Sequence, residues 1–193
     1  MRPMNTYDFD KTIFYPDSSV TFVRWYMRRH PFALLCWLPR MAVIGLAYLL
    51  KLIPKEKLKE NIFSFVRRID DIDAVLKVYW DEHESRIAPW YRAQHRPDDI
   101  VISASPEFVV KPMTDRLGIE LIASPMDRRG GKMYGRNCHG EEKVRRFYAA
   151  HPGAVTEAFY SDSLSDTPMA RIAQRAYLII DKGQTPVPWP EEK

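Results

Sequence analysis

The segment DDIVISASPEFVVKPMTDRLGIELIAS, residues 98–124, contains the pattern that predicts the fold class. Its first part, DDIVIS, and its last part, IELIAS, are short apolar runs typical of buried strands. The segment between them predicts a helix that begins near Pro106 and ends near Gly118. Strand, helix and strand in this order predict two parallel strands joined by a crossover helix.

The same alternation extends outward from this unit. Towards the C-terminus, GEEKVRRFYAAH and SDTPMARIAQRA predict helices, VTEAFYS and YLIID predict strands, and the Pro-rich tail GQTPVPWPEEK predicts an extended chain. At the other end, MNTYDF predicts a first strand. The chain is therefore predicted to have an α/β core with a parallel sheet.

A long helical segment interrupts this core after its first strand. Apolar residues recur at helical spacing in SSVTFVRWYMRRH and again in KLKENIFSFVRRIDDIDAVLKVYWDEHE. We expect residues 17–84 to form an all-helical cap, and residues 1–16 and 85–193 to form the α/β core.

The most apolar part of the predicted cap is PFALLCWLPRMAVIGLAYLLKLI, residues 31–53. Pro39 and Arg40 split it, and its longest charge-free run is 10 residues, short of the roughly 18 typical of a membrane-spanning helix. Two interpretations follow. The stretch forms a pair of buried helices, or it forms a helical hairpin that dips into a membrane surface with its basic flanks on anionic headgroups.

Composition limits the class of protein. An apolar content of 46% in 193 residues supports one domain with a buried core, and a net charge of +4 permits an anionic partner. Cys36 and Cys138 show neither a disulfide framework nor zinc spacing, and the first residues lack a secretory signal. We expect a cytoplasmic protein, membrane-associated under the second interpretation above. We assign the aromatic residues beside basic ones to amphipathic helices and expect no nucleic-acid partner.

Polar side chains follow the predicted strands. Asp8 and Asp10 come directly after the first strand, and two carboxylates on one side of a strand repel unless a cation or proton lies between them. In open parallel sheets the ligand crevice lies at the carboxyl ends of the strands. The polar residues that should meet there are Asp8, Asp10, Thr12, Ser103, Ser105, Lys143, Asp162 and Asp166.

This set suits phosphoryl transfer. Aspartate oxygens with few histidines favour Mg²⁺. One carboxylate can attack phosphorus, and a second can protonate the leaving oxygen and later activate water. A lysine, a hydroxyl and backbone N–H groups can hold the phosphoryl oxygens. Each short motif alone also fits a solvated turn or a helix cap, but their joint order favours the catalytic interpretation.

Four motifs in order, DFDKT, VISAS, GEEK and SDSLSD, resemble the haloacid dehalogenase (HAD) superfamily. The resemblance implies a Rossmann-like core with a helical cap inserted after the first strand, as in the phosphoserine-phosphatase-like branch. It implies a Mg²⁺-dependent phosphomonoester hydrolase in which Asp8 becomes phosphorylated, Asp10 is the general acid and base, and Thr12 supports their loop.

The later motifs carry the remaining roles that the resemblance implies. Ser103 and Ala104 would bind the phosphate, and Lys143 would neutralise the phosphate and Asp8. Asp162 would bind Mg²⁺ together with Asp8 and the backbone carbonyl of Asp10. Asp166 would complete the metal site.

Departures from the phosphoserine phosphatase pattern leave the substrate open. Ala104 and Ser105 stand where two glycines are usual, Asp17 where a glutamate is usual, and His139 near the usual place of the lysine. These features and the apolar cap are similar to the phosphatidylglycerophosphate phosphatase type C group. A small phosphomonoester, a lipid phosphate, or transfer of the phosphoryl group to an alcohol all remain. The candidate substrate-binding residues are Asp17, Arg24 and Ser105.

Overall fold

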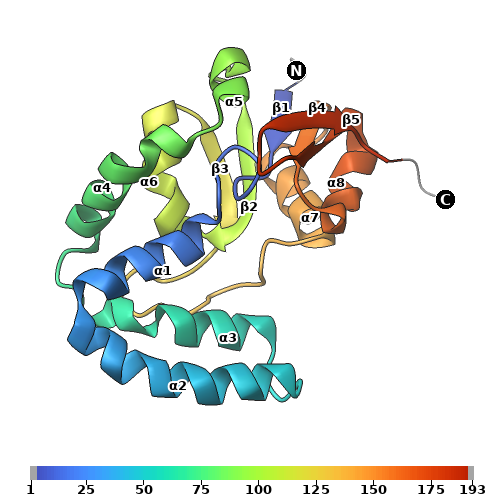
Figure 1. Ribbon diagram of the computed structural model, residues 1–193. Coiled ribbons are helices and arrows are strands. Elements are labelled where there is room, and N and C mark those ends of the chain that lie inside the picture. Colours follow the sequence, from blue (N-terminus) through green and yellow to red (C-terminus); the bar gives the residue numbers. More distant parts are fainter. Residues whose placement is uncertain (1–3, 191–193) are drawn as a thin grey trace.

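The computed structural model describes residues 4–190, which contain a six-stranded sheet with the strand order β3-β2-β1-β4-β5-β6 (Figure 1). Neighbouring strands are parallel except β5 and β6, which are antiparallel. This confirms the predicted α/β class. The strands are β1 (Met4–Tyr7), β2 (Ile100–Pro106), β3 (Glu120–Ser124), β4 (Thr156–Ser161), β5 (Ala173–Ile180) and β6 (Thr185–Pro188).

Helices cover both faces of the sheet. In Figure 1, α4 and α6 lie on one side and α7 and α8 on the other, while α2 and α3 lie side by side below. The α-helices are α1 (Ser18–Arg29), α2 (Pro31–Leu49), α3 (Lys55–Ile62), α4 (Ile72–His83), α5 (Pro89–Gln94), α6 (Glu107–Leu117), α7 (Glu141–Ala150) and α8 (Thr167–Ile172). Short 3₁₀ helices are η1 (Phe63–Arg68), η2 (Glu84–Arg86) and η3 (Leu164–Asp166).

Two apolar clusters form the core, one on each face of the sheet. Val101 belongs to the cluster that α6 covers, whereas Ile100 and Ile102 belong to the cluster with Phe147 of α7. Successive side chains of a strand point to opposite faces. A strand that is covered on both faces is therefore apolar at consecutive positions, which explains the unbroken IVI run.

The end of the predicted helix SDTPMARIAQRA is wrong. α8 ends at Ile172, and the next residues already belong to β5. Ala173 pairs with Thr156 and Arg175 with Ala158, so the ladder with β4 takes these residues out of the helix. Arg175 also forms an ion pair with Glu157 at 2.8 Å. The extended tail adds β6 at the edge of the sheet, where prolines are tolerated.

Two expectations for residues 31–53 are also wrong. α2 continues through Pro39 as one helix, and among its residues, all described by the structure, none is buried. Pro39 removes one backbone donor from the helix, but contacts with α3 hold both sides of it. Trp37 Nε1 donates to Ile62 O at 3.0 Å, and Arg40 donates to Asn61 Oδ1 at 2.7 Å. The interpretation as buried helices therefore fails.

Gly131 fixes the loop that follows β3 against η1. Its φ is +67°, and a Cβ there would lie 2.5 Å from the backbone oxygen of Phe63. We expect Gly131→Ala to lower the free energy of unfolding by about 2–4 kcal/mol, through left-handed strain plus overpacking. Gly153 also has a positive φ of +73°, but a Cβ at this position would have open space within 4 Å. Gly153→Ala should cost only about 1–2 kcal/mol. If urea unfolding showed the same loss of free energy of unfolding in both variants, the close approach of Gly131 to Phe63 would not be the cause of the larger loss.

Candidate active site

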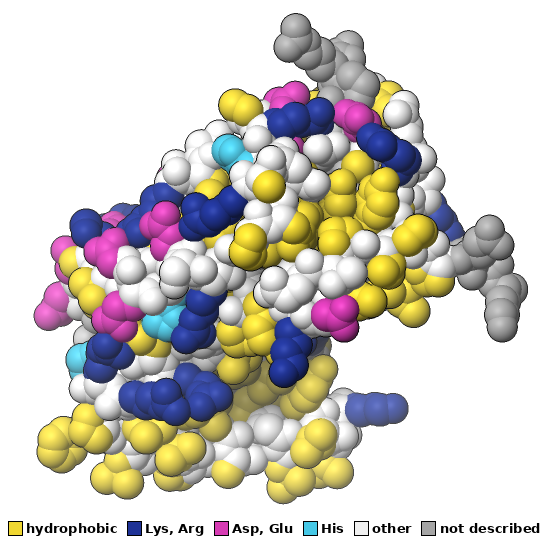
Figure 2. Space-filling view, turned by 45° about the horizontal axis from the view of Figure 1, so that its top comes forward, with side chains coloured by type: hydrophobic (Ala, Val, Ile, Leu, Met, Phe, Trp, Pro, Cys, Tyr) yellow, Lys and Arg dark blue, Asp and Glu magenta, His cyan; other side chains and the backbone are white. Residues whose placement is uncertain are grey.

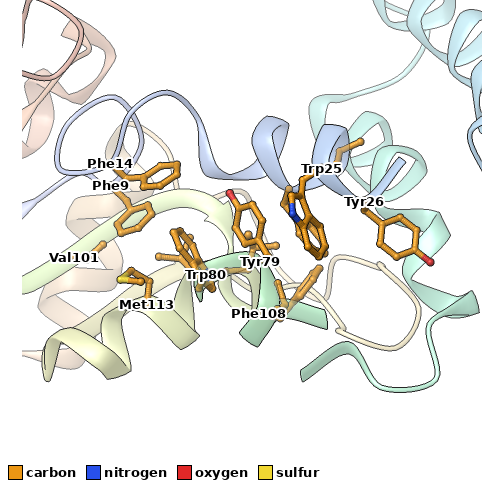
Figure 3. Close-up of a cluster of buried hydrophobic side chains, with 14 of the residues drawn as sticks. Phe9, Phe14, Trp25, Tyr26, Tyr79, Trp80, Val101, Phe108 and Met113 are labelled. Carbon is orange, nitrogen blue, oxygen red and sulfur yellow. Dashed lines mark hydrogen bonds between the residues drawn. The ribbon is translucent and has the colours of Figure 1, made fainter. Parts of the chain in front are cut away.

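The loop after β1 holds Asp8 and Asp10 on the side away from the core. Phe9 between them is fully buried, stacks on Phe14 with ring centroids 5.8 Å apart, and meets Trp80 edge-on at 5.9 Å (Figure 3). The Asp8 N–H donates to Tyr160 O of β4 at 2.8 Å. β1 lies between β2 and β4, so this loop stands where the strand order reverses, the usual ligand site of such sheets.

Lys143 bridges two carboxylates at the floor of the site. It stands in the first turn of α7, its side chain is 2% exposed, and its Nζ lies 2.7 Å from Asp8 Oδ1 and 2.6 Å from Asp166 Oδ2. Burial lowers the pKa of Lys143, but the charges of Asp8 and Asp166 outweigh burial and raise it. The lysine therefore stays charged. Ser161 Oγ also donates to Asp166 Oδ2, at 2.8 Å.

Asp10 points towards the start of α1. Its carboxylate accepts hydrogen bonds from Ser105 Oγ and, at 2.5 Å, from the N–H of Ser18. Burial, with the charge of Asp17, raises the pKa of Asp10 to about 6. A carboxyl group with such a pKa is present in both protonated and ionised forms near neutral pH, as a general acid and base requires.

Thr12 and Ser103 are buried and hold backbone groups. Thr12 Oγ1 accepts from the N–H of Asp162 at 3.0 Å, so it fixes the loop after β4 and not only its own loop. Ser103 Oγ accepts from the N–H of Ser105 at 3.0 Å. Sequence reasoning did not assign either of these backbone contacts.

The four predicted metal-binding carboxylates do not surround one point. Across residues 4–190, no three Asp, Glu, His or Cys side chains converge on a metal-sized site. The carboxylates are apart because Lys143 lies between Asp8 and Asp166, and because Asp10 faces Ser105. Oxygen donors remain, however: among the described residues, Asp166 Oδ1 is buried without a hydrogen-bond partner, and Asp162 lines the same pocket as Asp8. These donors fit Mg²⁺, which keeps waters and a substrate phosphate in its shell.

A cavity of about 550 Å³ lies above these groups, between the core and the helices of residues 17–84. Every predicted site residue except the buried Thr12 lines it, namely Asp8, Asp10, Asp17, Arg24, Ser103, Ala104, Ser105, Lys143, Asp162 and Asp166. Apolar side chains make up much of the opposite wall, namely Val20, Val23, Trp37, Tyr48, Leu58, Ile62 and Phe63. The catalytic roles of the predicted residues stay a prediction, but the fold brings them to one cavity.

Sequence reasoning missed Lys59. It lies on α3 and reaches the core, where its Nζ donates to Ala104 O at 2.6 Å and to Asn137 Oδ1 at 2.5 Å. Burial lowers its pKa to about 8. Lys55 and His139 line the cavity as well. In the sequence KEKLKE nothing separates Lys59 from the exposed Lys57, so only the three-dimensional arrangement identifies it.

Comparison with known proteins identifies the family of this chain. A model of the family described as haloacid dehalogenase-like hydrolase matches residues 6–171. Protein CicA of Caulobacter vibrioides is 32% identical over 92 residues, which are 44% of this chain and 41% of CicA. The matched part thus spans less than half of that curated relative.

Solved structures share the fold. A protein of unknown function from Bordetella pertussis Tohama I is 20% identical with a TM-score of 0.73, over 91% of this chain and 89% of that one. A phosphoserine phosphohydrolase-like protein from Francisella tularensis subsp. tularensis SCHU S4 is 10% identical with a TM-score of 0.56, over 93% and 88% of the two chains. At these identities the likeness concerns the fold.

Proposed function

Because the chain belongs to the haloacid dehalogenase-like hydrolase family, we propose that it is a Mg²⁺-dependent phosphomonoester hydrolase that works through a covalent phosphate on Asp8. The observation that carries this proposal is the buried bridge of Lys143 between Asp8 and Asp166 at the floor of the cavity. A fixed positive charge beside a carboxylate lets a phosphate dianion approach that carboxylate.

In the first step a carboxylate oxygen of Asp8 attacks the phosphorus of the bound ester. The bond between phosphorus and the alcohol oxygen breaks, and Asp10 gives its proton to that oxygen, so that the free alcohol leaves. Lys143 balances the charge of the phosphoryl oxygens. The hydroxyl of Ser103 and the backbone around Ala104, both on the cavity wall, orient these oxygens.

In the second step Asp10, now ionised, takes a proton from water while that water attacks the phosphorus. The bond between phosphorus and Asp8 breaks, which releases inorganic phosphate and restores both carboxyl groups. Asp8, Asp162, the backbone carbonyl of Asp10 and the unpartnered oxygen of Asp166 are the groups that would hold Mg²⁺. Bound there, the ion would supply positive charge that draws the phosphate to Asp8.

Metal removal tests the proposed chemistry. Release of inorganic phosphate should fall to background when the protein is treated with a chelator and should return with added Mg²⁺. The panel should contain phosphoserine, sugar phosphates, nucleotides and phosphatidylglycerophosphate, each with and without an added alcohol. Turnover that survives complete chelation would contradict the metal requirement. A new phosphoester formed in place of inorganic phosphate would identify a phosphotransferase.

A lipid phosphate is the second candidate, and the apolar wall of the cavity favours it. Trp37 and Tyr48 of α2 and Leu58 of α3 face the same space as the catalytic carboxylates. A sugar phosphate would leave this wall in contact with water, whereas an acyl or isoprenoid chain would cover it. Arg24 and Lys55 on the cavity wall suit a second anionic group. In the panel, phosphatidylglycerophosphate should then exceed soluble esters in kcat/KM by about tenfold or more.

A further inference from the structure

The outward face of α2 is apolar and exposed. Phe32 is 85% exposed and Leu49 77%, and the short turn after the helix adds Leu52 at 72%. Helices on the surface of soluble proteins normally turn a polar face to water. The exposed apolar residues of this face are Phe32, Leu35, Leu38, Val43, Leu46, Leu49, Leu50 and Leu52. Figure 2 shows hydrophobic side chains gathered along the lower edge of the molecule, where α2 lies.

The charge around this face is strongly positive. Residues 28–68 contain nine Lys and Arg and two Glu, a net charge of +7, whereas the whole chain carries +4. Lys and Arg side chains border the hydrophobic ones in Figure 2. An apolar face with a basic border matches an anionic lipid surface. A second copy of the chain fits it less well, because two such faces would bring positive borders together.

The topology decides how α2 can meet a bilayer. By length and composition the helix could cross a membrane. However, β1 precedes α2 and β2 follows it, and the two strands pair in the sheet, with Tyr7 opposite Val101. A single crossing would put these strands on opposite sides of the bilayer. Among the described residues no second helix is apolar enough for a return crossing.

We propose that α2 is an in-plane membrane anchor, which lies along the surface of an anionic bilayer with its apolar face among the acyl chains. The contacts of Trp37 and Arg40 with α3 stay intact in this orientation. The inner side of the helix remains free to line the cavity through Trp37 and Tyr48. The anchor keeps the cavity close to the bilayer. The proposal does not depend on the chemistry proposed for Asp8.

Vesicle flotation tests the anchor directly and needs no enzymatic activity. The full chain should float with vesicles of phosphatidylcholine and phosphatidylglycerol, and much less with phosphatidylcholine alone. High salt should weaken the binding without abolishing it, because salt screens the attraction of the basic border but not the contact of the apolar face with the acyl chains. Leu35→Ser, Val43→Ser and Leu46→Ser together should lower binding at least about tenfold, since three exposed apolar side chains leave the acyl region. Arg28→Glu with Arg67→Glu should also lower it at least about tenfold.

Matched controls distinguish binding through α2 from nonspecific hydrophobic binding to vesicles. Val78→Ser with Val155→Ser removes exposed apolar side chains elsewhere and should leave binding unchanged. Cys36 of α2 is exposed and Cys138 buried, so an environment-sensitive fluorophore can be attached at Cys36. Its emission should shift to the blue with anionic vesicles. Absence of binding, unchanged binding of the triple variant, or a dimer that the triple variant dissociates would each overturn the proposal.

Discussion

Asp8→Asn should abolish turnover while the protein remains folded. The amide has no carboxylate oxygen to attack phosphorus, so kcat should fall by about a thousandfold or more. The fold should survive because Lys143 keeps its contact with Asp166 at 2.6 Å. Asp71→Asn is the matched control and should change neither turnover nor stability, because Asp71 caps α4 outside the cavity and Asn caps helices equally well. Steady-state kinetics and urea unfolding give the two readouts.

Trapping of the covalent phosphate adds a test that does not depend on overall rate. Wild type mixed with substrate and quenched in acid should carry a phosphate on the peptide that contains Asp8, and alkali should remove it, since it is an acyl phosphate. Asp8→Asn should carry none. Full turnover in Asp8→Asn, or a phosphate attached elsewhere, would show that the proposed nucleophile is wrong.

Lys143→Met should destabilise the protein as well as inactivate it. The change leaves Asp8 and Asp166 facing each other in a buried site without their cation, and loss of one partner of a buried ion pair costs about 3–5 kcal/mol. Lys57→Met, at a lysine whose side chain is 61% exposed, should change the free energy of unfolding by less than about 1 kcal/mol. Denaturant unfolding measures both.

Two further comparisons test whether repulsion between Asp8 and Asp166 causes the loss of stability in Lys143→Met. Burial and the charge of Asp166 raise the pKa of Asp8, while Lys143 lowers it. Without the lysine, the folded state should therefore bind a proton on Asp8 more tightly than the unfolded state does. Protonation then stabilises the variant as pH falls, so its deficit relative to wild type should shrink at acidic pH and grow above it. Asp166→Asn added to Lys143→Met should restore part of the stability but none of the activity. An equal deficit at all pH values would point instead to a packing defect.

The sequence was sufficient for features that depend on local pattern. The strand–helix–strand unit at residues 98–124 follows from short apolar runs around an amphipathic segment, and the structure has β2, α6 and β3 there. The boundary between α8 and β5 was not predictable in the same way. Residues 173–176 fit a helix locally, and pairing with β4 decides that they extend the strand.

Contacts between segments distant in the sequence account for the rest. The position of the cavity could still be predicted from the polar residues that follow the strands, because the carboxyl ends of parallel strands lie at the same edge of the sheet. The reach of Lys59 from α3 to Ala104, and the turn of Asp10 towards Ser105, depend on how the helices of residues 17–84 sit on the core. Composition also could not tell an exposed apolar helix from a buried one, which is why two interpretations of α2 stood open.

The hydrogen bond from the N–H of Ser18 to Asp10 couples two properties of this protein. Ser18 is the first residue of α1, so the carboxyl group proposed to move protons is also a point where the helices of residues 17–84 are tied to the sheet. If α1 swung away there, Asp10 would lose this donor, but it would also lose the burial and the nearby charge of Asp17 that raise its pKa most, so its pKa would fall towards the ordinary value of a carboxyl group. Movement of α1 and the acidity of Asp10 would then be a single linked equilibrium, in which access to the cavity and the protonation of Asp10 change together.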